Sequence, residues 1–177
     1  MIIAVDEIKS MVDCGDITDN VIVSRLKAIE ETIRKYTHNN FQNRNIRFKA
    51  TSNGYELNCK PFFVRVGDTV QISQSQANNG LYTVEMVADD RLTVDRELFS
   101  ESYNLVTKIE YPEDVKQCAV DLFKWKMEFG DKIGIKSESE TLSRHSESVT
   151  YEDSATLFMG YPIGILSGLA LYKKARF

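Results

Sequence analysis

The residue types that most often carry enzyme chemistry are few in this chain and poorly placed for it. The only two histidines are His38, which follows a predicted helix end among asparagines, and His145, which lies between hydroxyl residues in segment 143–146. Serines next to an imidazole in sequence do not form a triad, because a triad needs a rigid frame and a third, orienting group. We therefore expect a surface or capping role for His38 and no catalysis at His145.

Phosphate, metal and cofactor sites are not predicted either. Segment 130–134 reads Gly-Asp-Lys-Ile-Gly, which matches neither the P-loop nor the dinucleotide-binding pattern. The three cysteines, Cys14, Cys59 and Cys118, are far apart and have no histidine at metal-ligand spacing. This pattern is typical of reduced, mostly buried cysteines in a cytosolic protein. The chain is expected to be no enzyme and to use no cofactor.

Composition narrows the class of partner. The chain has 177 residues, of which 42% are hydrophobic and 27% charged, and this is typical of a soluble globular protein of one domain or one domain with an insertion. The net charge is −4, whereas proteins that grip DNA phosphates usually carry a basic surplus. A mildly acidic protein can still surround DNA without binding it. The uncharged stretch 154–172 is long enough for a membrane span, but Pro162 and three glycines interrupt it, so no span is expected.

Helical periodicity predicts the elements at both ends of the chain. A short helix before Cys14 is followed by a longer one that begins after Thr18 or Asp19 and ends near Thr37, with a stripe of Ile22, Leu26, Ile29, Ile33 and Tyr36. A third helix starts at Pro112 as its first residue and ends at Gly130. Its buried side is predicted to hold Val115, Cys118, Ala119, Leu122 and Phe123.

Between residues 44 and 110 the period changes to two. Ile46 and Phe48 alternate with polar residues, as do Val70 and Ile72, and further β-like runs cover 81–88, 91–95 and 103–110. Turn signals separate these runs at Asn53-Gly54, Gly67-Asp68, Asn78-Asn79-Gly80 and Asp89-Asp90. Five or six short strands in this length favour a small SH3-like barrel. Phe62, Phe63 and Tyr82 are expected in its core rather than in a nucleic-acid site.

The predicted fold class is therefore α+β: a small bundle of about four helices, residues 1–43 and 111–177, with an inserted SH3-like β-barrel domain at 44–110. The connection 131–153 is rich in Ser and Glu and has no clear period, so a functional or mobile loop is expected. The last helix, from Pro162 almost to the end, is apolar around nearly its whole circumference. Either both of its sides pack within one chain, or one side meets a neighbouring subunit through Ile163, Gly164, Ile165, Gly168 and Leu169.

The order of these elements resembles the head–tail connector (adaptor) family of tailed phages. The strings that carry the resemblance are Tyr111-Pro112-Glu113-Asp114-Val115, Lys136-Ser137-Glu138-Ser139 leading to Ser148-Val149-Thr150-Tyr151, Gly160-Tyr161-Pro162, and Leu169 followed by Tyr172-Lys173. It covers roughly residues 1–43 and 111–177. The smaller members of the family are essentially helical, so the β insertion departs from their pattern and its contacts are left open.

The resemblance implies a ring of identical subunits, a dodecamer by analogy, in the virion neck. The ring docks beneath the portal protein and above a stopper or tail-completion protein, DNA passes through its middle, and the subunit is made in the cytoplasm of the bacterial host. By the same resemblance, the portal-binding residues are Leu171, Tyr172, Lys173, Lys174, Arg176 and Phe177. The loop near the channel or a neighbouring subunit is represented by Lys136, Ser137, Glu138, Ser139, Arg144, Ser148, Val149 and Tyr151.

Three other functions stay open at this point. Another neck or tail-completion subunit would share the same fold, because fold alone does not separate these roles. A nucleic-acid-binding β module would bind DNA in a manner that weakens as salt rises. An enzyme, such as a hydrolase, would lose its activity on replacement of His145.

Overall fold

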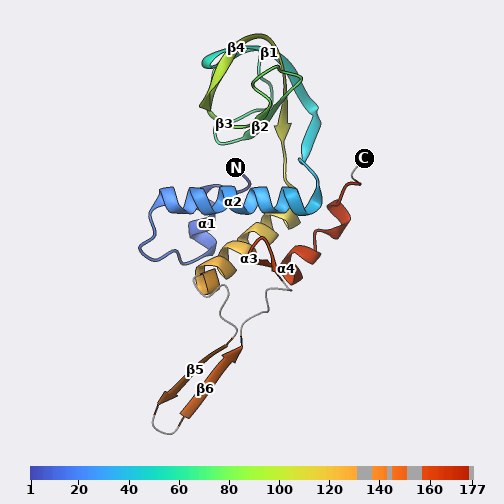
Figure 1. Ribbon diagram of the computed structural model, residues 1–177. Coiled ribbons are helices and arrows are strands. Elements are labelled where there is room, and N and C mark those ends of the chain that lie inside the picture. The colour runs from blue at the N-terminus through green and yellow to red at the C-terminus, as the bar shows by residue number, and fades with distance from the viewer. Residues whose placement is uncertain (131–136, 143–144, 151–156, 176–177) are drawn as a thin grey trace. The chain divides into compact units, whose positions relative to one another are not determined.

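The computed structural model describes residues 1–130, 137–142, 145–150 and 157–175, and the chain divides into two compact units (Figure 1). The sheet unit combines Met1–Ala4 with Asn40–Pro112, and the helical unit combines Val5–Asn39 with Glu113–Phe177. The sequence predicts boundaries at 44 and 110 and assigns the N-terminus to the helical domain. Met1–Ala4 belongs instead to the sheet unit, where Ile2 and Ile3 are buried.

The class is α+β, as predicted. The described residues form four α-helices and one four-stranded antiparallel sheet, together with two small two-stranded sheets. None of the helices in this described part is long and apolar enough to cross a membrane.

The helical unit is built around α2, Asp19–Thr37, with the short α1, Val5–Met11, before it. The predicted stripe of α2 is confirmed for Ile22, Leu26, Ile29 and Ile33, which are fully buried, while Tyr36 is half-buried. The helix begins after Thr18, whose backbone is extended, and it ends at Thr37. The next residue, His38, has a left-handed backbone (φ 49°) and its N–H donates to the carbonyl of Arg34. His38 therefore caps the helix, as predicted.

The second long helix, α3, covers Glu113–Phe129. Pro112 precedes the helix instead of being its first residue, and the two acidic residues that follow it lie in the first turn, where the helix dipole favours negative charge. The predicted buried side is confirmed for Val115, Cys118, Ala119, Leu122 and Phe123. Near its end, the sulfur of Met127 accepts a hydrogen bond of 2.7 Å from the guanidinium of Arg25 on α2.

The sheet unit has four strands where the sequence predicts five or six: β1 Gln42–Asn58, β2 Thr69–Ser73, β3 Gly80–Val87 and β4 Arg91–Ile109. The predicted runs 91–95 and 103–110 are parts of the one strand β4. The expected turn at Asn53-Gly54 lies inside β1, where the pairing register with β4 shifts on both sides of Gly54 (φ 59°). Some β-bulges and the tight hairpin turns both use a positive φ, so glycine can signal either one.

The sequence predicts a closed barrel for this unit, but the described strands do not form one. The strand order is β1-β4-β2-β3, and no pairing among the described residues joins β1 to β3, so the sheet is open. The long strand β4 has two sets of neighbours, however. Its C-terminal part pairs with β2 at Ile72↔Val106, and its N-terminal part pairs with β3 at Val84↔Val94. Because β2 also pairs with β3, the sheet curves strongly around a core of Leu57, Val70, Ile72, Val84, Leu92, Val94 and Val106 (Figure 1).

A buried polar cluster ties the β2–β3 connection to the middle of β1 and β4. The side-chain amide of Asn78 donates to Ser52 Oγ (3.0 Å) and to the carbonyl of Phe99 (2.9 Å). Its oxygen accepts the Phe99 N–H (2.8 Å). The Asn104 amide also donates to Ser52 Oγ (3.0 Å), and Asn78, Asn104 and Ser52 are all buried. The cluster replaces ladder hydrogen bonds that are missing where the register of β1 and β4 shifts.

We expect Asn78→Ala to destabilise the sheet unit by about 1–3 kcal/mol, because the Phe99 N–H loses its side-chain acceptor and the Phe99 carbonyl keeps Ser52 Oγ but loses the Asn78 amide. The free energy of unfolding in urea measures the change. Asn58→Ala is the matched control: this asparagine is exposed, its hydrogen bond to Thr51 is long (3.5 Å), and we expect a change below about 0.5 kcal/mol. Equal losses for the two variants would contradict this role of Asn78.

The predicted polar loop contains a hairpin. Strands β5, Ser137–Leu142, and β6, His145–Thr150, pair antiparallel from Ser137↔Thr150 to Leu142↔His145. The prediction of an irregular connection is therefore wrong over these two strands. The signal that was missed is the alternation of Ser and Glu with period two on both sides of a two-residue link.

Candidate functional site

The C-terminal segment, residues 161–174, follows one tight turn and contains two short helices. Strands β7, Leu157–Phe158, and β8, Tyr161–Pro162, form a two-residue hairpin in which Met159 (φ 52°) and Gly160 (φ 80°) both have positive φ. Such values are those of a type I′ turn. The helix α4 follows at Ile163–Ser167, and the 3-10 helix η3 covers Ala170–Tyr172.

The prediction of one continuous helix from Pro162 almost to the end is wrong. Pro162 precedes α4 as its N-cap, and α4 ends at Ser167 after five residues. Gly164 and Gly168 explain the short length, since each glycine costs a helix about 1 kcal/mol relative to alanine. The break at Gly168 lets the chain change direction before η3.

Four contacts hold the end of this segment to α2 and α3. The Tyr172 hydroxyl donates to the carboxylate of Asp114 at the start of α3, at 2.7 and 2.8 Å. The side-chain amide of Asn39 donates to the Tyr172 carbonyl (3.3 Å), and the Lys174 N–H donates to the carbonyl of Thr37 (2.8 Å). The ammonium of Lys173 lies 3.9 Å from the centre of the Tyr36 ring. The segment is thus fixed as far as Lys174.

The apolar side chains of the segment divide into a buried set and an exposed set. Leu166 and Leu169 are buried, and the sulfur of Cys118 on α3 contacts the carbonyl of Ile165 at 3.7 Å. In contrast, Leu171 is 95% exposed and Ile163 is 39% exposed. One side of the segment packs within the chain and the other faces outward.

The residues predicted for an inter-subunit helix fall on both sides of this division. Ile163, Gly164 and Gly168 are exposed, and a side chain added at Gly164 would meet open space. Ile165 is half-buried, while Leu169 is buried within its own chain. The exposed surface available for a neighbouring subunit is thus smaller than the sequence predicts, because Leu169 packs within its own chain.

The residues predicted for portal binding lie mostly on the outward side. Leu171, Lys173 and Lys174 are exposed, and Tyr172 is half-buried because its hydroxyl is bound to Asp114. Arg176 and Phe177 lie outside the described residues. Asp114 and Tyr36 were not predicted to matter here; the signal that could have found them is that each lies next to a helix end.

The predicted loop residues are placed only by their backbone. Ser137, Glu138 and Ser139 lie on β5, and Ser148 and Val149 lie on β6, with Glu138 paired with Val149 and Ser139 with Ser148. Lys136, Arg144 and Tyr151 lie outside the described residues. These positions therefore stay a prediction.

No protein-family model matches the chain, and no curated protein matches it significantly. Function must therefore be argued from the surfaces themselves. Within the described residues, no group of three His, Cys, Asp or Glu side chains is arranged to hold a metal ion. The arrangement at the C-terminal segment is suited to docking: a fixed backbone presents an uncovered leucine beside two lysines.

The cysteines have the character of buried apolar side chains. Burial raises the pKa of the Cys59 thiol to about 11 and that of the Cys118 thiol to about 12. Both thiols stay protonated at neutral pH, and a protonated thiol is neither a nucleophile nor a metal ligand. The hydrogen bond to Asp114 likewise raises the pKa of Tyr172, so the hydroxyl keeps its proton for this contact through the neutral range.

We expect Tyr172→Phe to free the end of the chain, because phenylalanine keeps the ring but cannot donate to Asp114. Trypsin should then cleave after Lys173 and Lys174 several-fold faster than in the original protein, measured by mass spectrometry. Tyr55→Phe is the control, since Tyr55 is an exposed tyrosine of the sheet unit. Cleavage at an unchanged rate would show that the hydrogen bond does not hold the segment.

We expect iodoacetamide at pH 8 to modify Cys59 and Cys118 at least about 30-fold more slowly in the folded protein than in urea. The raised pKa values leave about a hundredth of the usual thiolate fraction at Cys59 and about a thousandth at Cys118, and unfolding restores the ordinary pKa. Because the folded pKa values lie above the unfolded ones, unfolding should also become easier as pH rises from about 9 towards 11. Peptide mapping after alkylation measures the rates, and fast modification of native Cys118 would contradict its burial.

Proposed function

We propose that this chain is a structural ring subunit of a tailed-phage neck, a head–tail connector that docks beneath the portal and continues the DNA channel toward the tail. The observation that carries the proposal is the C-terminal segment, where Leu171 is 95% exposed on a backbone held by four contacts. A leucine on a mobile tail loses entropy when it binds, whereas this one is already ordered.

The charges beside Leu171 support the same role. Lys173 and Lys174 follow Leu171 after Tyr172 and are exposed, so the leucine is an apolar anchor with cations nearby. Such an anchor suits an apolar pocket with an acidic rim, here proposed to belong to the portal ring. In a closed ring, this contact is repeated once per subunit, so a modest affinity at each site gives a stable assembly.

The proposal also covers the remaining parts of the chain. We assign the β5–β6 hairpin to the channel or to a neighbouring subunit, and the exposed face of α4, at Ile163 and Gly164, to contacts within the ring. The sheet unit is proposed to be an open relative of small SH3-like barrels, supported by the mutual pairing of β2, β3 and β4. No catalytic role and no cofactor is part of the proposal.

A second candidate is a nucleic-acid-binding module, and one observation favours it. Phe62 and Phe63 are 41% and 80% exposed, contrary to their predicted place in the core, and Lys60 and Arg65 lie on either side of them in sequence. Aromatic rings and cations together can bind single strands. Two cations neutralise few phosphates, however, so such binding would be weak at physiological salt. Tight DNA binding with a steep salt dependence would favour this candidate over a connector.

We expect Leu171→Asp to weaken docking to the portal ring encoded beside this chain by at least about 30-fold, as for the loss of a central apolar anchor. Electron microscopy and co-sedimentation of the mixed proteins measure docking, and circular dichroism checks that helix content is unchanged. Val21→Asp is the matched control, since Val21 is an exposed apolar residue of α2 in the same unit. Unchanged docking of Leu171→Asp, or docking by neither protein, would contradict the proposal.

A further inference from the structure

A loop of the sheet unit holds an uncovered phenylalanine in a strained conformation. This aromatic loop, residues 60–66, joins β1 to β2, and within it Phe63 is 80% exposed with a positive φ of 54°. Bulky residues rarely adopt this left-handed conformation, and where they do, other contacts must hold it. Phe62 lies between Phe63 and Phe48, with ring centres 6.1 and 5.7 Å away.

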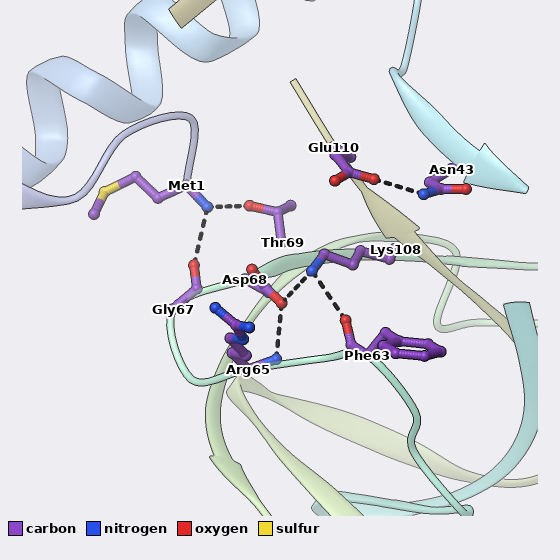
Figure 2. Close-up of polar contacts among 9 residues, drawn as sticks. All are labelled: Met1, Asn43, Phe63, Arg65, Gly67, Asp68, Thr69, Lys108 and Glu110. Carbon is purple, nitrogen blue, oxygen red and sulfur yellow. Dashed lines mark hydrogen bonds and ion pairs between the residues drawn. The ribbon is translucent and has the colours of Figure 1, made fainter. Parts of the chain in front are cut away.

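The contacts that hold the loop are shown in Figure 2. The ammonium of Lys108 on β4 donates to the carbonyl of Phe63 (3.0 Å) and pairs with the carboxylate of Asp68 (2.8 Å), and this ion pair is largely buried. The same carboxylate accepts the Arg65 N–H (2.8 Å). The Phe63 ring points away from the ion pair. Strain and a partly buried ion pair thus fix an aromatic ring that nothing in the described chain covers.

The two charged residues within the aromatic loop, on either side of Phe62 and Phe63 in sequence, are both positive. Lys60 and Arg65 are exposed, and neither has an ion-pair partner among the described residues. Lys108 and Asp68 neutralise each other. The aromatic loop is therefore a convex apolar surface with two free cations, which suits an apolar hollow with a negative rim.

The helical unit has a shallow, open depression with an apolar wall and an acidic rim. The α1–α2 pocket, about 710 Å³ in volume, is lined by the turn after α1 and by the last part of α3. Its apolar wall consists of Met11, Val12, Cys14, Ile17 and Met127. Methionine is adaptable, and its sulfur makes favourable contacts with aromatic rings. The depression is shallow and open to solvent, so a phenylalanine ring could lie against its apolar wall without being enclosed.

The rim of the α1–α2 pocket is acidic. Asp13, Asp16 and Glu128 supply three carboxylates against the one ammonium of Lys124. All four side chains are exposed. Loop and pocket are thus complementary in polarity and in charge, and both are present on every copy of the chain.

We propose that the aromatic loop of one copy of this chain docks into the α1–α2 pocket of a second copy. The inference rests on the proposed ring, for which it names a contact between neighbouring subunits. Because loop and pocket are different surfaces, the contact is head-to-tail, the kind that repeats around a ring. One loop in one pocket buries less than the roughly 1,200 Å² of a stable free dimer, so the contact forms mainly where copies are held side by side.

Photo-cross-linking tests the contact, since it traps a weak complex covalently. Phe63 is replaced by p-benzoylphenylalanine in the full-length chain, and the protein is irradiated at high concentration. We expect a covalent dimer whose cross-linked peptides join position 63 to segment 11–17 or segment 124–128. Phe99 is the matched control position, as it is also a phenylalanine of the sheet unit and is 69% exposed. The dimer yield should be at least about five-fold higher from position 63 than from position 99.

Paired charge-reversal variants distinguish this specific contact from non-specific association. In the protein that carries the probe at position 63, Arg65→Glu should lower the dimer yield about three- to five-fold, as expected for one ion pair at an exposed rim. Asp16→Lys in the partner copy should do the same, and combining the two variants should restore the yield. Failure to restore the yield would overturn the proposed contact.

Other outcomes also decide the question. Equal yields from positions 63 and 99, cross-links that map outside the two pocket segments, or preferential cross-linking to added single-stranded DNA would each overturn the inference. Portal docking without the pocket cross-link would refute this contact and leave the proposed function standing. The cross-link without portal docking would refute the proposed function and leave this contact standing.

Discussion

The packing of α2 against α3 is the interaction on which the helical unit depends. The two helices lie on either side of the inserted sheet unit in sequence, and the buried stripe Ile22, Leu26, Ile29 and Ile33 belongs to the core that holds them together. Burial of four such side chains contributes up to about 6–12 kcal/mol. This packing places the end of α2 near the start of α3, and those two ends supply the residues that hold Tyr172, Lys173 and Lys174.

The elements with strong local signals could be predicted from the sequence. The stripe of α2, the end of that helix at Thr37 and the buried side of α3 depend on period and capping, which are local properties. The strands β2 and β3 and the link at Asp89-Asp90 also have local signals. Where a local signal has two structural meanings, prediction failed: Asn53-Gly54 marks a bulge inside β1, and the polar stretch between two predicted runs continues the strand β4.

The candidate surfaces were harder to predict, because exposure depends on distant residues. Phe62 and Phe63 have the composition of a core segment, whereas the contacts that hold their loop include Lys108, 45 residues away in sequence from Phe63. The C-terminal segment has enough apolar residues for a buried helix, but its glycines divide it, and Leu171 is left outside. Both surfaces combine an ordered backbone with an uncovered apolar side chain and nearby lysine or arginine. A surface with that combination can bind a partner with little further loss of conformational entropy.

The division of the chain also affects its biogenesis. Neither unit is continuous in sequence. The sheet unit combines Met1–Ala4 with Asn40–Pro112, and the helical unit combines Val5–Asn39 with Glu113–Phe177. During synthesis on the ribosome, all residues of the sheet unit emerge before α3 does. The apolar face of α2 therefore lacks its packing partner α3 until α3 has emerged. At 5–20 residues per second, that interval lasts roughly 5–20 seconds. During it the uncovered apolar face of α2 is the kind of surface that chaperones bind.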